Sequence, residues 1–242
     1  MRRKLSEHIQ ELEQHYKEGI WLSFNHIAEL YLYEFYEKKE DFQLASDPMN
    51  RFYLELGKQY EEAEEMDRAI DAYQRAITWN PTDLDARFAK IELEKANGEL
   101  DRVQKETMEL YPYLCTRATM ARFYRNLAFC QVELYNPNLA AMLYQYSNLF
   151  FQTENADNEI VYLEKALKTK YPEWDIHHLQ AELASNQIPV AAPSKTLGLL
   201  YQIGKSEEAK GHYQEAMECY LMVYDLTQDE EVRSHLMKLS SE

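Results

Sequence analysis

The sequence predicts an all-α fold built from stacked pairs of helices. Glycine and proline are scarce, with 6 Gly and 7 Pro among 242 residues, which disfavours a turn-rich sandwich or barrel. Apolar side chains recur every three to four residues along most of the chain, as they do on the buried face of amphipathic helices. A pattern of small and aromatic residues also returns several times, which is typical of repeat proteins.

Two apolar stripes at helical spacing open the chain. They consist of Leu5, Ile9, Leu12 and Tyr16, followed by Ile20, Phe24, Ile27, Tyr31 and Phe35. Because each stripe marks one face of a helix, we expect residues 1–45 to form an N-terminal helical hairpin that packs on the segment after it.

The clearest repeat begins at Tyr53. Its pattern is Tyr53-x2-Leu56-Gly57-x2-Tyr60, followed by Ala69-x3-Tyr73, Ala76 and Pro81. Small residues at Gly57 and Ala69 allow two helices to cross closely, and the tyrosines fill the space around the crossing. Pro81 is expected to end the second helix.

Weaker copies of this pattern follow. They start near Phe88, at Tyr124 with its second half at Ala140-x3-Tyr144, and at Leu200 with its second half at Ala216-x3-Tyr220. We therefore expect three repeats in 46–154 and a fourth in 193–242, where the stripe Val232, Leu236 and Leu239 predicts a C-terminal capping helix. Residues 155–192 are expected to form a non-consensus helical pair and a linker, whose proline-bounded end at 187–193 is a candidate hinge.

The repeat pattern resembles that of the tetratricopeptide repeat family, with Tyr53 in place of the usual first tryptophan. The resemblance implies a superhelix of helical hairpins whose first helices line a concave groove. It implies a non-enzymatic scaffold or adaptor that binds a peptide or a partner protein in that groove. The groove residues implied are Arg51, Lys58, Arg122, Arg125, Asn126, Phe129, Tyr201 and Lys205.

Two subfamilies resemble the chain less well. Some tetratricopeptide proteins clamp the acidic tail of heat-shock chaperones, but Leu54, Lys58 and Asn126 depart from the clamp pattern and only Arg122 keeps the charge required at its place. Some bacterial peptide-sensing regulators place a helical segment before their repeats, as here. However, residues 1–45 contain no basic recognition helix, so DNA binding is not expected.

The charge balance limits the partners. With 26 Lys+Arg against 42 Asp+Glu the net charge is −16, which disfavours nucleic acid and anionic membranes. Three arginines, Arg117, Arg122 and Arg125, nevertheless lie within nine residues. They are candidates for binding an acidic group of the partner, unless they pair with neighbouring acids such as Glu133.

No phosphate-loop, zinc-protease or nucleophile-elbow motif is present, so no catalytic residue, metal or cofactor is predicted. Two alternatives remain open. One is a structural subunit that self-associates through the aromatic N-terminal hairpin, with Tyr33 and Tyr36 exposed. The other is a metal-dependent enzyme that uses His8, Glu11 and His15.

The cysteines indicate a reducing compartment. Cys115, Cys130 and Cys219 are odd in number and lack metal-site spacing. The basic N-terminus is followed by glutamates rather than by an apolar signal segment, and no stretch is apolar for long enough to span a membrane. We therefore expect a cytoplasmic protein.

Overall fold

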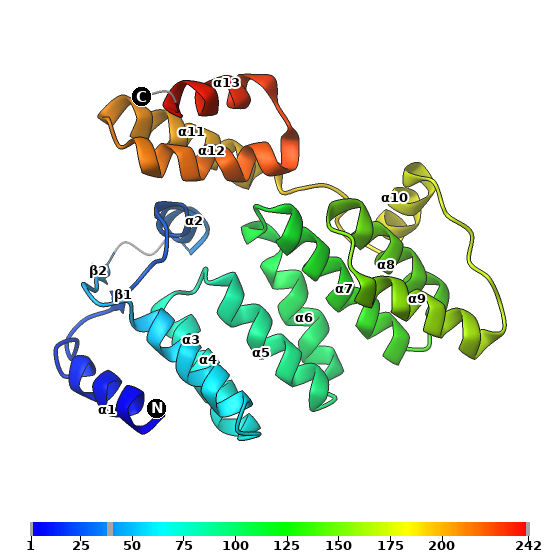
Figure 1. The fold of residues 1–242 in the computed structure, drawn as a ribbon, viewed down its shortest axis with the longest axis horizontal. Coiled ribbons are helices and arrows are strands. Elements are labelled where there is room, and N and C mark those ends of the chain that lie inside the picture. Colours follow the sequence, from blue (N-terminus) through cyan, green and yellow to red (C-terminus); the bar gives the residue numbers. More distant parts are fainter. Residues whose placement is uncertain (1, 38–40, 241–242) are drawn as a thin grey trace. The chain divides into compact units, whose positions relative to one another are not determined.

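The computed structural model describes residues 2–37 and 41–240, so positions 38–40 of the expected N-terminal segment and the last two residues lie outside the described residues. Almost all of the regular structure in the described part is α-helical, which confirms the predicted fold class (Figure 1). The chain divides into two compact units, one up to Gly98 and one from Glu99 onward.

The first unit consists of paired helices preceded by a short sheet. Its elements are α1 (Arg2–Glu13), β1 (Trp21–Leu22), α2 (Ile27–Glu37), β2 (Gln43–Leu44), α3 (Met49–Glu61), α4 (Met66–Trp79) and α5 (Leu84–Ala96). Helix α3 packs against α4, α4 packs against α5, and α1 packs on α3.

The predicted helix over residues 20–26 is wrong. The chain is extended there, β1 pairs in parallel with β2, and α2 begins only at Ile27. The Ile20 carbonyl accepts a 2.8 Å hydrogen bond from Gln43 N–H, and Ser23 N–H donates at 2.9 Å to the Trp79 carbonyl. A helix starting at Ile20 would lose these backbone hydrogen bonds. The apolar spacing therefore does not determine the secondary structure of this segment.

The expected exposed aromatic patch also differs. Tyr33 is only 2% exposed and packs against Phe24 and Phe42, with ring centroids 5.7 and 5.4 Å away. Its burial contradicts the expectation that it is available for self-association. Phe35, which was expected on the buried stripe, is 45% exposed and pairs with Tyr36.

The two clearest repeats share one packing unit. A Cβ added at Gly57 would lie 2.4 Å from Cε1 of Tyr73, and one added at Gly204 would lie 2.7 Å from Cε1 of Tyr220. Each tyrosine also donates its hydroxyl to a glutamate one turn beyond the glycine, to Glu61 at 2.6 Å and to Glu208 at 2.9 Å. The crossing predicted from small residues and tyrosines is therefore observed.

Four turns between consecutive helices share one backbone geometry. The residue two positions before the second helix is left-handed in every case, with φ between +59° and +83°: Glu64, Gly98, Tyr135 and Gly211. In three of these turns, the N–H of the residue after the left-handed one donates a hydrogen bond to the carbonyl five residues earlier. This hydrogen bond closes the end of the preceding helix.

The second unit begins with α6 and ends with three helices joined through an extended segment. Its elements are α6 (Leu100–Leu110), the 3₁₀ turn η1 (Tyr111–Tyr113), α7 (Arg117–Glu133), α8 (Pro137–Phe150), α9 (Glu154–Leu167), α10 (Ile176–Ser185), α11 (Ser194–Lys210), α12 (Tyr213–Thr227) and α13 (Glu230–Leu239). Helices α6 to α9 pack in sequence, whereas α10 returns to pack on α8 (Figure 1). Helix α13 packs on α12.

The segment expected to be a hinge is anchored. Three consecutive carbonyls accept hydrogen bonds from tyrosine hydroxyls of η1, α7 and α8. Tyr124 donates to Pro189 at 2.8 Å, Tyr146 to Val190, and Tyr111 to Ala191 at 2.8 Å. The segment is therefore held along its length rather than left free to bend.

Removing these hydroxyls should loosen the segment. With about 1 kcal/mol for each hydrogen bond, Tyr124→Phe and Tyr146→Phe are each expected to raise the rate of thermolysin cleavage within 187–193 about fivefold. Tyr162→Phe is the matched control, since Tyr162 is 62% exposed on α9. Equal cleavage rates in all three variants would show that the tyrosines do not anchor the segment.

Candidate functional site

The eight expected groove residues lie on three helices. Arg51 and Lys58 are on α3 in the first unit. Arg122, Arg125, Asn126 and Phe129 are on α7, and Tyr201 and Lys205 are on α11, both in the second unit. Each is the first helix of a helical pair, as the resemblance implies.

On α3, Arg51 is part of a hydrogen-bond network within the chain. Its Nε donates at 2.7 Å to Oδ1 of Asn25, which also accepts from Asn50 at 3.0 Å. Asn50 is buried and donates to Asp83 at 2.9 Å. Arg51 thus fixes the segment before α2 on α3, while Lys58, two turns further along, is exposed.

The same network includes a buried acid. Glu29 accepts hydrogen bonds from Asn25 N–H at 2.6 Å and from the Asn80 amide at 2.8 Å. Burial nevertheless dominates and raises the pKa of the Glu29 carboxyl above its ordinary value. All the partners come from the fold, so this network holds α2 in place.

Two arginines of α7 contact the end of α8. Arg117 donates at 2.8 Å to the carbonyls of both Phe150 and Leu149, and Arg125 donates at 3.3 Å to the carbonyl of Phe151. Cations at a helix C-terminus stabilise its unpaired carbonyls. Arg117 and Arg125 therefore cap the end of α8. The sequence suggests two other roles, binding an acidic group of the partner or pairing with acids such as Glu133.

The middle of the α7 face combines apolar area with polar groups. Arg122 and Phe129 are half-buried, and Asn126 between them is 2% exposed. Nδ2 of Asn126 is buried and has no hydrogen-bond acceptor within the described residues. A buried donor without an acceptor costs about 1–3 kcal/mol, so this amide is an unusual feature of a packed helix.

On α11, Tyr201 contacts the capping helix. Tyr201 donates its hydroxyl to Glu231 of α13, and this hydrogen bond raises the pKa of Tyr201 to about 12. Nζ of Lys205 lies 5.4 Å from the Tyr201 ring centroid. Helix α13 therefore covers part of the face expected to bind a partner.

The candidate metal residues do not converge. Helix α1 ends at Glu13, so His15 lies beyond it, and the His8 ring packs edge-on against Phe52. Within 2–37 and 41–240 no three His, Cys, Asp or Glu side chains are placed to hold a metal ion. The three cysteines are buried and form no disulfide, and burial raises the pKa of Cys219 to about 12.

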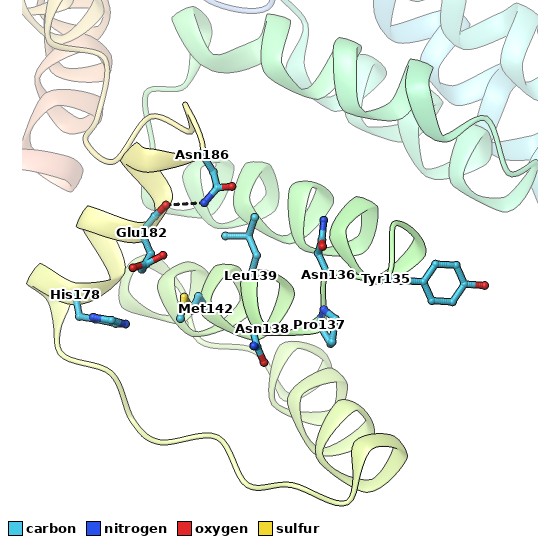
Figure 2. Close-up of a pocket in the computed structure, with 9 residues that line it drawn as sticks. All are labelled: Tyr135, Asn136, Pro137, Asn138, Leu139, Met142, His178, Glu182 and Asn186. Carbon is cyan, nitrogen blue, oxygen red and sulfur yellow. Dashed lines mark hydrogen bonds between the residues drawn. The ribbon is translucent and has the colours of Figure 1, made fainter.

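A pocket of about 580 Å³ that no sequence motif indicated opens between the start of α8 and α10 (Figure 2). Figure 2 shows Leu139 between Glu182 of α10 and Asn136 at the turn before α8. Its residues form no motif, and they meet only because α10 returns to α8. A second pocket, of about 410 Å³, lies between Tyr16, Trp21 and Trp79 in the first unit.

A family model described as tetratricopeptide repeat matches residues 51–83 and 197–230. No curated protein matches the sequence. A solved structure described as YrrB, a TPR protein with an unusual peptide-binding site, is similar at 13% identity and a TM-score of 0.40, covering 87% of this chain and 98% of that chain.

The two matched segments coincide with the helical pairs α3–α4 and α11–α12, which share the glycine–tyrosine crossing and the tyrosine–glutamate hydrogen bond. No helix of the described ranges has the length and apolar character needed to cross a bilayer. Motif, packing and family match agree that these two helical pairs are tetratricopeptide repeats.

Proposed function

We propose that the chain is a non-enzymatic cytoplasmic scaffold that holds an extended peptide or a partner protein against the first helices of its repeats. Tetratricopeptide repeats support a role in protein interaction. Our candidate for the surface that binds the partner is the face of α7. Three buried cysteines that form no disulfide agree with a reducing compartment.

The observation that carries the α7 proposal is the buried amide of Asn126. Its Nδ2 lacks an acceptor, and a main-chain carbonyl of a bound peptide would supply one. Arg122 and Phe129 lie one turn away on either side and share its helix face. Because the amide is covered from solvent, a bound peptide has to displace the side chains over it.

The flanking side chains suit a peptide with an acidic group. Phe129 is half-buried and offers apolar contact area, and a guanidinium binds a carboxylate through two parallel hydrogen bonds. Arg122 and Arg125 provide local positive charge on a chain of net charge −16. That net charge also supports a protein or peptide partner rather than nucleic acid or an anionic membrane.

Charge reversal at Arg122 tests this surface. Tagged protein is used to capture partners from a lysate of the source cells, and the proteins that co-elute are identified and quantified. We expect Arg122→Glu to lose the partners that the unmodified chain retains. Lys105→Glu is the matched control, since Lys105 is 77% exposed on α6 and undergoes the same change of charge.

Both variants must keep the melting temperature of the unmodified chain for the comparison to count. Equal recovery of the same partners by Arg122→Glu and the unmodified chain would reject the α7 surface. Recovery that falls equally in Lys105→Glu would instead indicate general electrostatic attraction. A specific loss in Arg122→Glu supports the proposal.

A further inference from the structure

The pocket between α8 and α10 is separate from all eight expected groove residues. It has a volume of about 580 Å³ and is lined by the turn before α8, by the first turns of α8 and by one face of α10 (Figure 2). All of these elements belong to the second unit.

The polar lining offers hydrogen-bond acceptors. The Asn136 amide donates at 3.1 Å to Oε1 of Gln131, and the Asn186 amide donates at 2.9 Å to the Glu182 carbonyl, drawn in Figure 2. Because both amides use an N–H inside the protein, their oxygens are the atoms better placed to serve a ligand. The exposed Glu182 carboxylate adds an anionic acceptor, and the lining contains no lysine or arginine.

The floor of the pocket is apolar. Leu139 and Met142 of α8 are half-buried, and Figure 2 shows both between Glu182 and the turn before α8. An aliphatic stem can pack on such a floor while its charged end reaches a polar rim. A donor-rich, cationic end group on an aliphatic stem therefore matches both parts of the lining.

We propose that this pocket binds an arginine side chain presented by a partner protein. The guanidinium pairs with the Glu182 carboxylate and donates to the amide oxygens of Asn136 and Asn186, while its stem packs on Leu139 and Met142. The net charge of −16 favours the approach of a basic segment. This second surface does not depend on the α7 proposal, which concerns an acidic group at other residues.

The test is an NMR titration of the full chain with acetyl-Gly-Arg-Gly-amide, using as a neutral probe the same peptide with citrulline in place of arginine. We expect saturable shifts of the Asn136 and Asn186 side-chain amide signals with the arginine peptide. Citrulline keeps the shape but lacks the charge, so the citrulline peptide should bind at least about fivefold more weakly.

Two variants separate the pocket from general attraction to an acidic protein. Glu182→Gln is expected to weaken binding of the arginine peptide at least about fivefold. Glu159→Gln removes the same charge from an exposed position on α9 and should leave binding unchanged. Met142→Ser tests the apolar floor and should also weaken binding.

Three results would overturn the proposal. They are equal binding of the arginine and citrulline peptides, equal weakening by Glu182→Gln and Glu159→Gln, and the absence of saturable shifts at the pocket amides. Arg122→Glu should not change this titration. Failure of the pocket and failure of the α7 surface are therefore distinguishable.

Discussion

Gly204→Ala is expected to destabilise the second unit by about 1–3 kcal/mol. The new Cβ would lie 2.7 and 2.9 Å from Cε1 and Cδ1 of Tyr220, a ring with 0% exposure that cannot move into solvent. Either α11 and α12 separate or the ring leaves its rotamer, and both weaken the packing between these helices. Gly57→Ala should act in the same way in the first unit, where the distance to Tyr73 is 2.4 Å.

Gly198→Ala provides a matched control of opposite sign. Gly198 lies on the same helix as Gly204, and a Cβ there would meet no atom within 4 Å. Alanine is a better helix former than glycine, so this variant should be more stable by about 0.5–1 kcal/mol. Urea denaturation followed by circular dichroism measures both changes, and destabilisation by both variants would attribute the loss to the helix rather than to Tyr220.

This core was predictable because its signal is local. Gly57 and Tyr73 lie on consecutive helices joined by one short turn. The same pair recurs at Gly204 and Tyr220. The helical periods and the small residues at the crossing agree, so local preference and packing specify the same structure. The capping helix was also predictable from its apolar spacing. Two residues of its predicted buried face, Val232 and Leu239, are 3% and 5% exposed.

The structural features that the sequence did not predict depend on contacts between residues far apart in the sequence. The apolar stripe that begins at Ile20 has the spacing of a helix. The Ile20 carbonyl nevertheless accepts a hydrogen bond from Gln43 N–H, and the segment after it joins a parallel sheet. The three tyrosines that hold residues 189–191 come from three elements that are far away in the sequence. The pocket has the same origin, because no local pattern predicts that α10 packs on α8.

The expected groove residues illustrate the same limit in another way. The repeat pattern predicts which positions of α3, α7 and α11 share a face, but it does not predict what else covers that face. Arg51 is bonded to Asn25, and Tyr201 is bonded to Glu231 of the capping helix. Such intramolecular partners depend on the segments outside the repeats, which have no consensus sequence.

Glu208→Gln is expected to weaken the docking of α13 on the last repeat by about 1–2 kcal/mol. The Glu208 carboxylate accepts hydrogen bonds from Tyr220 at 2.9 Å and from His235 and Lys238 of α13 at 2.7 Å each. Glutamine keeps the shape but loses the negative charge that favours the Lys238 contact. Hydrogen exchange of the α13 amides should therefore be faster in this variant, while Glu159→Gln should match the unmodified chain.

The same carboxylate makes stability depend on pH in a defined direction. The hydrogen bond from Lys238 contributes most to lowering the pKa of Glu208 from an ordinary 4.5 to about 2. A carboxyl whose pKa is lowered by folding stabilises the folded state fully above the unfolded pKa and loses that contribution as the pH falls through the folded pKa. Between pH 4.5 and 2 the unmodified chain should therefore lose more stability than Glu208→Gln.

The measurement is the difference between the two melting-temperature curves over that range, because other carboxyls that titrate there contribute equally to both proteins. The curves should converge as the pH approaches 2, since protonated Glu208 and glutamine are then both neutral. Parallel curves would mean that folding does not lower the pKa of Glu208. In that case the bond to Lys238 could not be what holds the capping helix on the last repeat.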